Sequence, residues 1–169
     1  LLSAYYDIRR GLGFNKSPEE YGAFPTDPYS HTPGAQGAKQ PGMTGLVKEE
    51  IIARWGELGV TVEAGQLAFA PVMLRAEELR AEEAAPTTFE YLDLAGAAQS
   101  LTVPAGALAF TYCQVPVQVV AAGNAAIEIT YADGTTETVP GTTLSADLSA
   151  SIFAREGRVA KLVVHTDVV

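Results

Sequence analysis

Residues 126–139, AIEITYADGTTETV, decide the fold class of this chain. β-Branched and aromatic residues alternate with polar ones on both sides of Asp133-Gly134. An Asp-Gly dipeptide between two such runs is the strongest short-range signature of a β-hairpin. The sequence therefore predicts strands at 126–131 and 137–139, joined by a tight turn.

The same period of two residues recurs from residue 60 onward. A second hairpin is predicted around Arg155-Glu156-Gly157, between strands at 151–154 and 158–165. Further strands are predicted at 66–73, 88–94, 100–103 and 107–120. Short strands at such regular spacing indicate an antiparallel β-sandwich. Residues 74–85, LRAEELRAEEAA, leave two interpretations open, a helix or an extended edge.

The N-terminal third has a helical period instead. Residues 1–12 form an amphipathic helix that Gly11 and Gly13 stop, and 43–58 form a second helix that ends at Gly59. The fold class is therefore α+β: an N-terminal helical segment with a long loop, then an antiparallel β-sandwich. We expect two domains, 1–60 and 61–169. Because the printed chain begins inside a helix, we expect it to be a piece of a longer polypeptide.

The composition excludes several classes of protein. Eleven basic against twenty acidic residues give a net charge of −9, and no Lys or Arg cluster supplies the attraction that drives most nucleic-acid binding. The printed residues hold no apolar run that could span a bilayer and no signal-peptide pattern, so we expect a soluble protein without membrane partners. Cys113 is the only cysteine, which excludes an intrachain disulfide and a cysteine-based metal site. Its apolar surroundings predict a buried, inert thiol.

A loop at 21–50, rich in proline and glycine, carries the candidate site. Loops longer than about 12–15 residues are uncommon in compact domains and are usually functional or disordered. Aromatic rings in this loop can stack on a sugar, while carboxylate and amide groups hydrogen-bond its hydroxyls. We therefore expect an oligosaccharide or glycoside to bind here. The candidate substrate-binding residues are Asp27, Tyr29, His31, Gln40, Thr44 and Glu49.

Simpler interpretations of this loop stay open. Proline and glycine also occur in loops that only connect, and Glu49 stabilises the first turns of its helix through the helix dipole. Glycoside chemistry needs two carboxyl groups, and Asp27 is the only loop candidate for the second. For His31 we expect hydrogen bonding, because His165 is too far away in sequence to complete a metal-ligand spacing. The sequence thus predicts no metal and no cofactor, and the catalytic residues are unknown.

Three segments carry a resemblance to a known family: QPGMTG at 40–45, ELGV at 57–60 and GQLAFAPV at 65–72. In this order they resemble the C-terminal end of (α/α)6-barrel glycoside hydrolases and phosphorylases of the cellobiose phosphorylase type. The resemblance implies a late barrel helix, then a strand that opens a small β-sandwich. For Thr44 and Gly45 the resemblance implies only a turn that faces sugar or phosphate. The aromatic residues that flank this turn in the phosphorylases are absent, and so is the barrel with the catalytic acid.

Together these observations predict the C-terminal fragment of a carbohydrate-active enzyme, a glycoside hydrolase or phosphorylase. The fragment contributes a loop of the substrate cleft and a supporting β-sandwich, and by itself it is expected to be inactive. Its partners are the missing catalytic barrel or a second copy, bound through the helical face. The alternative is a stand-alone β-sandwich that binds carbohydrate or mediates adhesion, with the helices as a cap.

Overall fold

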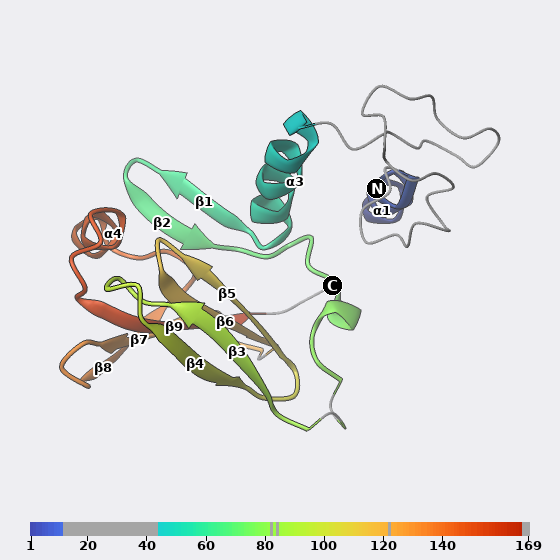
Figure 1. Ribbon diagram of the computed structural model, residues 1–169. Helices are drawn as coiled ribbons and strands as arrows, with labels where there is room; N and C mark the ends of the chain where they lie inside the picture. The colour runs from blue at the N-terminus through green and yellow to red at the C-terminus, as the bar shows by residue number, and fades with distance from the viewer. Residues whose placement is uncertain (12–43, 82, 84, 122, 167–169) are drawn as a thin grey trace. The chain divides into compact units, whose positions relative to one another are not determined.

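The computed structural model describes residues 1–11, 44–81, 83, 85–121 and 123–166, with the side chains at 10, 11 and 44–50 excepted (Figure 1). The chain divides into two compact units, Leu1–Ala53 and Arg54–Val169. The first holds helix α1 and most of helix α3; the second holds all the strands. The α+β class is confirmed. None of the described helices is long and apolar enough to span a bilayer.

Both predicted helices are present. Helix α1 spans Leu2–Gly11 and ends at the predicted glycine, and α3 spans Thr44–Glu57. Gly59 follows α3 with φ +67°, in the left-handed conformation expected of a residue that ends a helix. A Cβ at this position would lie 2.1 Å from the carbonyl carbon of Ala70, so only glycine fits.

A five-stranded sheet forms the centre of the second unit. It contains β5 (Ala107–Tyr112), β6 (Val115–Ala121), β7 (Ala126–Tyr131), β8 (Thr136–Pro140) and β9 (Val159–Thr166). Their order is β5-β6-β9-β7-β8. The predicted Asp-Gly hairpin is confirmed as β7–β8. All neighbours are antiparallel except β6 and β9, so the sheet is mixed rather than wholly antiparallel.

The prediction of a hairpin strand at 151–154 is wrong. These residues belong to helix α4 (Ala146–Phe153), whose N-cap Ser145 accepts a hydrogen bond from the backbone N–H of Leu148. Leu148 and Ile152, four residues apart, face the core from one side of this helix. Because α4 rather than a tight turn precedes β9, that strand can enter the sheet between β6 and β7 and run parallel to β6.

The single strand predicted at 107–120 is two strands with a tight turn between them. Tyr112 pairs with Val115, and the two loop residues Cys113 and Gln114 have φ of +48° and +66°. Positive φ at both positions is the type I′ geometry that suits the twist of a hairpin. Cys113 is half-buried in this turn and not in a strand interior, so the prediction of a buried strand thiol is wrong.

The main core lies on one face of the sheet. It is closed by α4, by the hairpin of β1 (Val60–Glu63) and β2 (Gln66–Phe69), and by Leu58 after α3 (Figure 1). Ser149 of α4 connects two of these elements, because its Oγ accepts a hydrogen bond from Leu67 N–H at 2.9 Å. Fully buried apolar residues include Leu67, Phe69, Leu74, Val117, Val119, Ile127, Ile129, Leu144, Leu162 and Val164.

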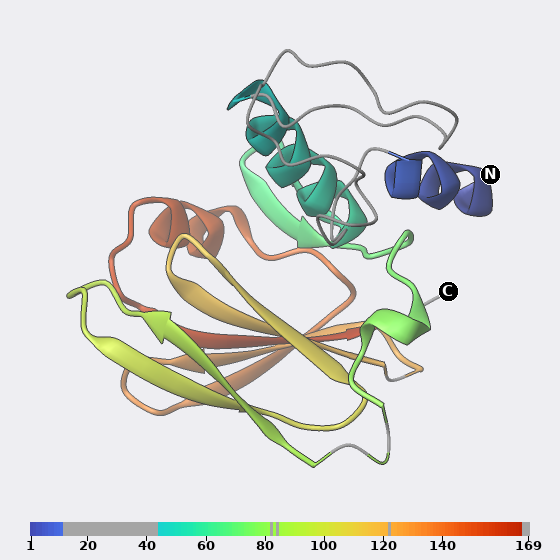
Figure 2. The same cartoon turned by 45° about the vertical axis from the view of Figure 1, so that its right-hand side comes forward.

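A second hairpin covers part of the opposite face, as both views show (Figures 1 and 2). It consists of β3 (Thr87–Leu92) and β4 (Ala98–Val103). The buried Gln118 of β6 donates to the carbonyl of Thr102 at 2.7 Å, and Gln114 donates to the carbonyl of Asp93 at 2.9 Å. Two amides therefore fix this hairpin to the sheet, and the layers form a sandwich.

The described residues of the range 74–85 match neither of the two interpretations left open by the sequence, a helix or an extended edge. Among the residues of this range that the structure describes, only a short 3-10 turn, η1 (Ala76–Glu78), is regular, and it lies between extended residues. The Glu78 side chain accepts a hydrogen bond from the backbone N–H of Arg75, which stabilises this single turn. Glu78 also accepts a hydrogen bond from Arg54 of α3, outside the segment.

Candidate functional site

The side chains of the predicted substrate-binding residues all lie outside the described part of the chain, so their arrangement is not tested. Asp27, Tyr29, His31 and Gln40 lie outside the described residues. Thr44 is the first residue of α3 and Glu49 lies in the same helix, but their side chains also lie outside the described part. The sugar site in this loop stays a prediction.

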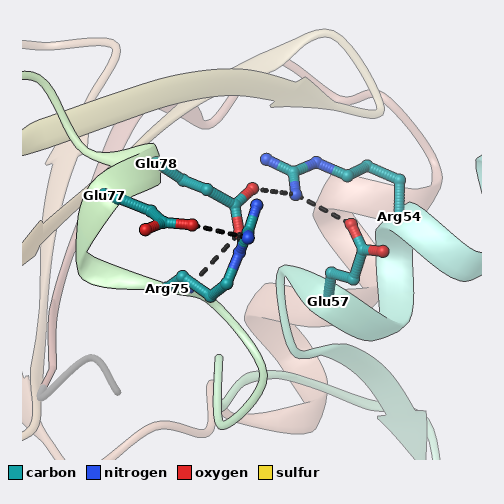
Figure 3. Close-up of polar contacts among 5 residues, drawn as sticks. All are labelled: Arg54, Glu57, Arg75, Glu77 and Glu78. Carbon is teal, nitrogen blue, oxygen red and sulfur yellow. Dashed lines mark hydrogen bonds and ion pairs between the residues drawn. The ribbon is translucent and has the colours of Figure 1, made fainter. Parts of the chain in front are cut away.

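A cluster of five charged residues links the last turn of α3 to η1 (Figure 3). We call it the junction cluster; it consists of Arg54, Glu57, Arg75, Glu77 and Glu78. One guanidinium nitrogen of Arg54, Nη1, lies 2.8 Å from Glu57 Oε2 and 2.6 Å from Glu78 Oε2. Arg75 contacts Glu77 at 2.5 Å and Glu78 at 3.4 Å. Positive and negative groups thus alternate from the end of α3 to η1.

Burial makes this cluster different from an ordinary surface ion pair. The side chain of Glu57 is 4% exposed and that of Glu78 is 16% exposed. Burial alone raises the pKa of Glu78, but the hydrogen bonds from Arg54 and from Arg75 outweigh it and lower this pKa below its ordinary value. Burial likewise opposes the charge of Arg54, and the bonds to Glu57 and Glu78 outweigh it and raise the Arg54 pKa.

This arrangement suits a structural clamp and not acid–base chemistry. A general acid in a glycosidase needs a carboxyl whose pKa is raised, whereas the pKa of Glu78 is lowered. In addition, Arg54 occupies the space between Glu57 and Glu78, where a substrate bond would have to lie (Figure 3). The junction cluster therefore fixes the last turn of α3 to the segment before β3.

Aromatic contacts reinforce the same joint. Trp55, next to Arg54, meets the ring of Tyr112 edge to face at a centroid distance of 5.0 Å and that of Phe110 at 6.2 Å. Such pairs contribute about 0.5–1.5 kcal/mol beyond the area that they bury. The pKa of the Tyr112 hydroxyl is raised, mainly by burial and secondly by the neighbouring Cys113. Trp55 thus anchors α3 on strand β5.

The described residues hold no group of three or more His, Cys, Asp or Glu side chains that could bind a metal ion. His165 on β9 lies beside Glu128 on β7, at 3.4 Å between Nε2 and Oε1. This nitrogen is buried and finds no hydrogen-bond partner among the described residues. One histidine and one half-exposed carboxylate are too few ligands for a metal site.

The sequence analysis did not predict the junction cluster, although two of its ion pairs have a spacing that can be recognised in the sequence. Arg54-x-x-Glu57 and Arg75-x-x-Glu78 each place opposite charges three residues apart, a spacing that brings side chains together in a helical turn. The contact between Arg54 and Glu78 spans 24 residues and has no local signal. Only the folded chain brings the two pairs together.

Comparisons of the sequence with family models and with curated proteins do not assign this chain to a family. No protein-family model matches the sequence, and no curated protein matches it either.

Proposed function

We propose that this chain is part of a carbohydrate-active enzyme, a glycoside hydrolase or phosphorylase, and that α3 joins its helical catalytic unit to a supporting β domain. One observation supports this most directly. Ile51 and Ile52 of α3 are 51% and 70% exposed, one turn before Trp55 and Leu58, which pack on the β domain. The apolar face of α3 thus continues beyond the domain that covers its last turn.

An apolar helix face of this kind indicates another helical surface as its partner. Isoleucine side chains gain about 25 cal/mol for each Å² of apolar surface removed from water, so exposed neighbours favour association. In the sequence, Val47 precedes Ile51 by four residues and extends the same helical spacing. The junction cluster and Trp55 hold the other end of α3, as the joint between a catalytic unit and its support requires.

The substrate is proposed to meet the loop at 21–50. In this proposal Tyr29 stacks on a sugar ring, while Asp27, His31 and Gln40 hydrogen-bond its hydroxyls. Thr44 and Glu49 lie in α3, so the loop leads directly into the helix that would face the catalytic unit. The junction cluster supplies no acid–base pair, because Arg54 lies between its carboxylates, and we expect the isolated chain to release no product from an aryl glycoside.

Calorimetric titration with a panel of glucosides and inorganic phosphate tests the proposed sugar site. We expect heat from at least one glucoside, and its loss in Asp27→Asn and Tyr29→Ala. Tyr131→Phe, a change on strand β7 far from the loop in sequence, is the matched control and should bind as the unchanged chain does. Absence of heat with every member of the panel would refute sugar binding by this loop.

The alternative function is a stand-alone β-sandwich that binds carbohydrate or mediates adhesion. It is favoured by the burial of Leu58 and by the packing of Trp55, which make the end of α3 part of the sandwich itself. The two functions differ in the role of Ile51 and Ile52. If they form a docking face, the apolar dye ANS should bind the chain, and the Ile51→Glu, Ile52→Glu double variant should bind it less. Equal dye binding by both proteins, with sugar binding intact, would favour the stand-alone module.

A further inference from the structure

Strand β5 forms one edge of the five-stranded sheet, and its hydrogen bonds show which groups point outward. Ala121 N–H on β6 donates to the carbonyl of Gly106, whereas Arg80 N–H donates to the carbonyl of Ala107 from outside the sheet. Ladder bonds alternate along an antiparallel strand, so the residues that follow at intervals of two repeat these directions. The backbone groups of Ala107, Ala109 and Thr111 therefore point away from β6.

Most of this edge is unused. Arg80 occupies the carbonyl of Ala107 at the start of the strand. Within the part of the chain that the structure describes, no hydrogen bond reaches the outward N–H and C=O groups of Ala109 and Thr111. An edge strand with free backbone groups is a template for a further strand.

The opposite edge of the same sheet is protected. The N–H groups of Tyr131 and Gly141 donate to Thr135 and Ala125, respectively, across the β7–β8 pair, so Thr136, Thr138 and Pro140 point outward from β8. Pro140 has no N–H to offer at this edge, and β8 also carries Glu137. Charge and proline are the usual means of preventing edge pairing, and β5, ALAFTY, has neither.

We propose that β5 pairs antiparallel with β5 of a second copy of this chain, about a two-fold axis perpendicular to the sheet. In this register Phe110 lies opposite Phe110 of the second copy. Ala109 of one copy lies opposite Thr111 of the second copy, and Thr111 lies opposite Ala109. Each of these two pairs exchanges reciprocal N–H···O=C bonds. The register uses the free groups and leaves the bond from Arg80 to Ala107 intact.

Charge and symmetry favour a second copy as the occupant. Each chain has a net charge of −9, so two copies repel wherever their acidic surfaces meet. The residues from Ala107 to Ala121 contain no charged side chain, so pairing of two β5 strands brings no like charges of this segment together. A β5–β5 contact also closes on itself as a dimer, whereas pairing of β5 with β8 would propagate into a chain of molecules.

Sedimentation equilibrium of the full chain tests the proposal, with Thr111→Pro as the first variant. Proline removes an outward N–H from each copy without removing a bond to β6, because Thr111 makes no ladder bond there. We expect a dimer for the unchanged chain and dissociation at least about 30-fold easier for Thr111→Pro, since about two hydrogen bonds are lost. Thr138→Pro makes the same change at an outward position of β8 and should leave the dimer intact.

A second variant separates loss of pairing from loss of folding. Thr111→Lys keeps the backbone N–H and places a charge at the edge, so it should also give a monomer. Circular dichroism should show unchanged strand content for both Thr111 variants. A monomeric unchanged chain at every concentration, a dimer that survives both Thr111 variants, or equal dissociation by Thr138→Pro would each overturn the proposal.

Discussion

Substitution of Arg54 by methionine removes the cation at the centre of the junction cluster and keeps an apolar side chain of similar length. Glu57 and Glu78 then lose the guanidinium that lies 2.8 and 2.6 Å from their carboxylates, although Glu78 keeps its contact with Arg75. Removing one partner of a buried ion pair costs about 3–5 kcal/mol. Because the Arg54 side chain is 37% exposed, water screens part of this interaction and we expect a loss of about 2 kcal/mol.

Urea unfolding followed by tryptophan fluorescence measures this loss. Trp55 is the only tryptophan of the chain and lies beside Arg54, so its signal reports on the joint itself. The midpoint should fall in Arg54→Met while the slope with urea stays the same. Arg158→Met breaks the exposed pair with Asp147 and should leave the urea midpoint nearly unchanged, because water screens an exposed ion pair. If Arg54→Met loses no more stability than Arg158→Met, the cluster does not clamp α3.

The stability difference between the unchanged chain and Arg54→Met should also depend on pH. The folded pKa of Glu78 is lowered from 4.5, so the stabilisation by its charge is fully present above that value. It is lost as the pH falls through the folded pKa. The difference should therefore be constant near neutral pH and narrow below pH 4.5. A difference that widens on acidification would contradict the assigned role of Glu78.

Three further outcomes test the packing of the β domain. Gly59→Ala should unfold at a much lower temperature than Gly134→Ala: both residues have positive φ, but only at Gly59 would a Cβ collide with backbone, at 2.1 Å. Ser149→Ala leaves the buried N–H of Leu67 without its acceptor and should cost about 1–3 kcal/mol, measured by thermal unfolding. Gln118→Leu removes a bond that holds hairpin β3–β4, so amide exchange in this hairpin should accelerate more than exchange in β7.

Local features of the sequence predicted much of the secondary structure correctly. Asp133-Gly134 specified a hairpin and Gly59 specified a helix end, because both depend on backbone conformations that few residues adopt. The apolar period of α3 likewise predicted its extent. The candidate sugar-binding residues, from Asp27 to Glu49, were identified from residue chemistry alone and stay a prediction.

The sequence by itself thus determined the α+β class and the positions of both N-terminal helices, since these follow from short-range propensity and period. Only the tertiary structure decided that 146–153 is a helix, because Leu148 and Ile152 bury against the sheet as a helical pair. It also decided that β9 enters the sheet parallel to β6, and that Arg54 meets Glu78 across 24 residues. Such contacts depend on how distant segments pack together, and no local pattern of residues specifies them.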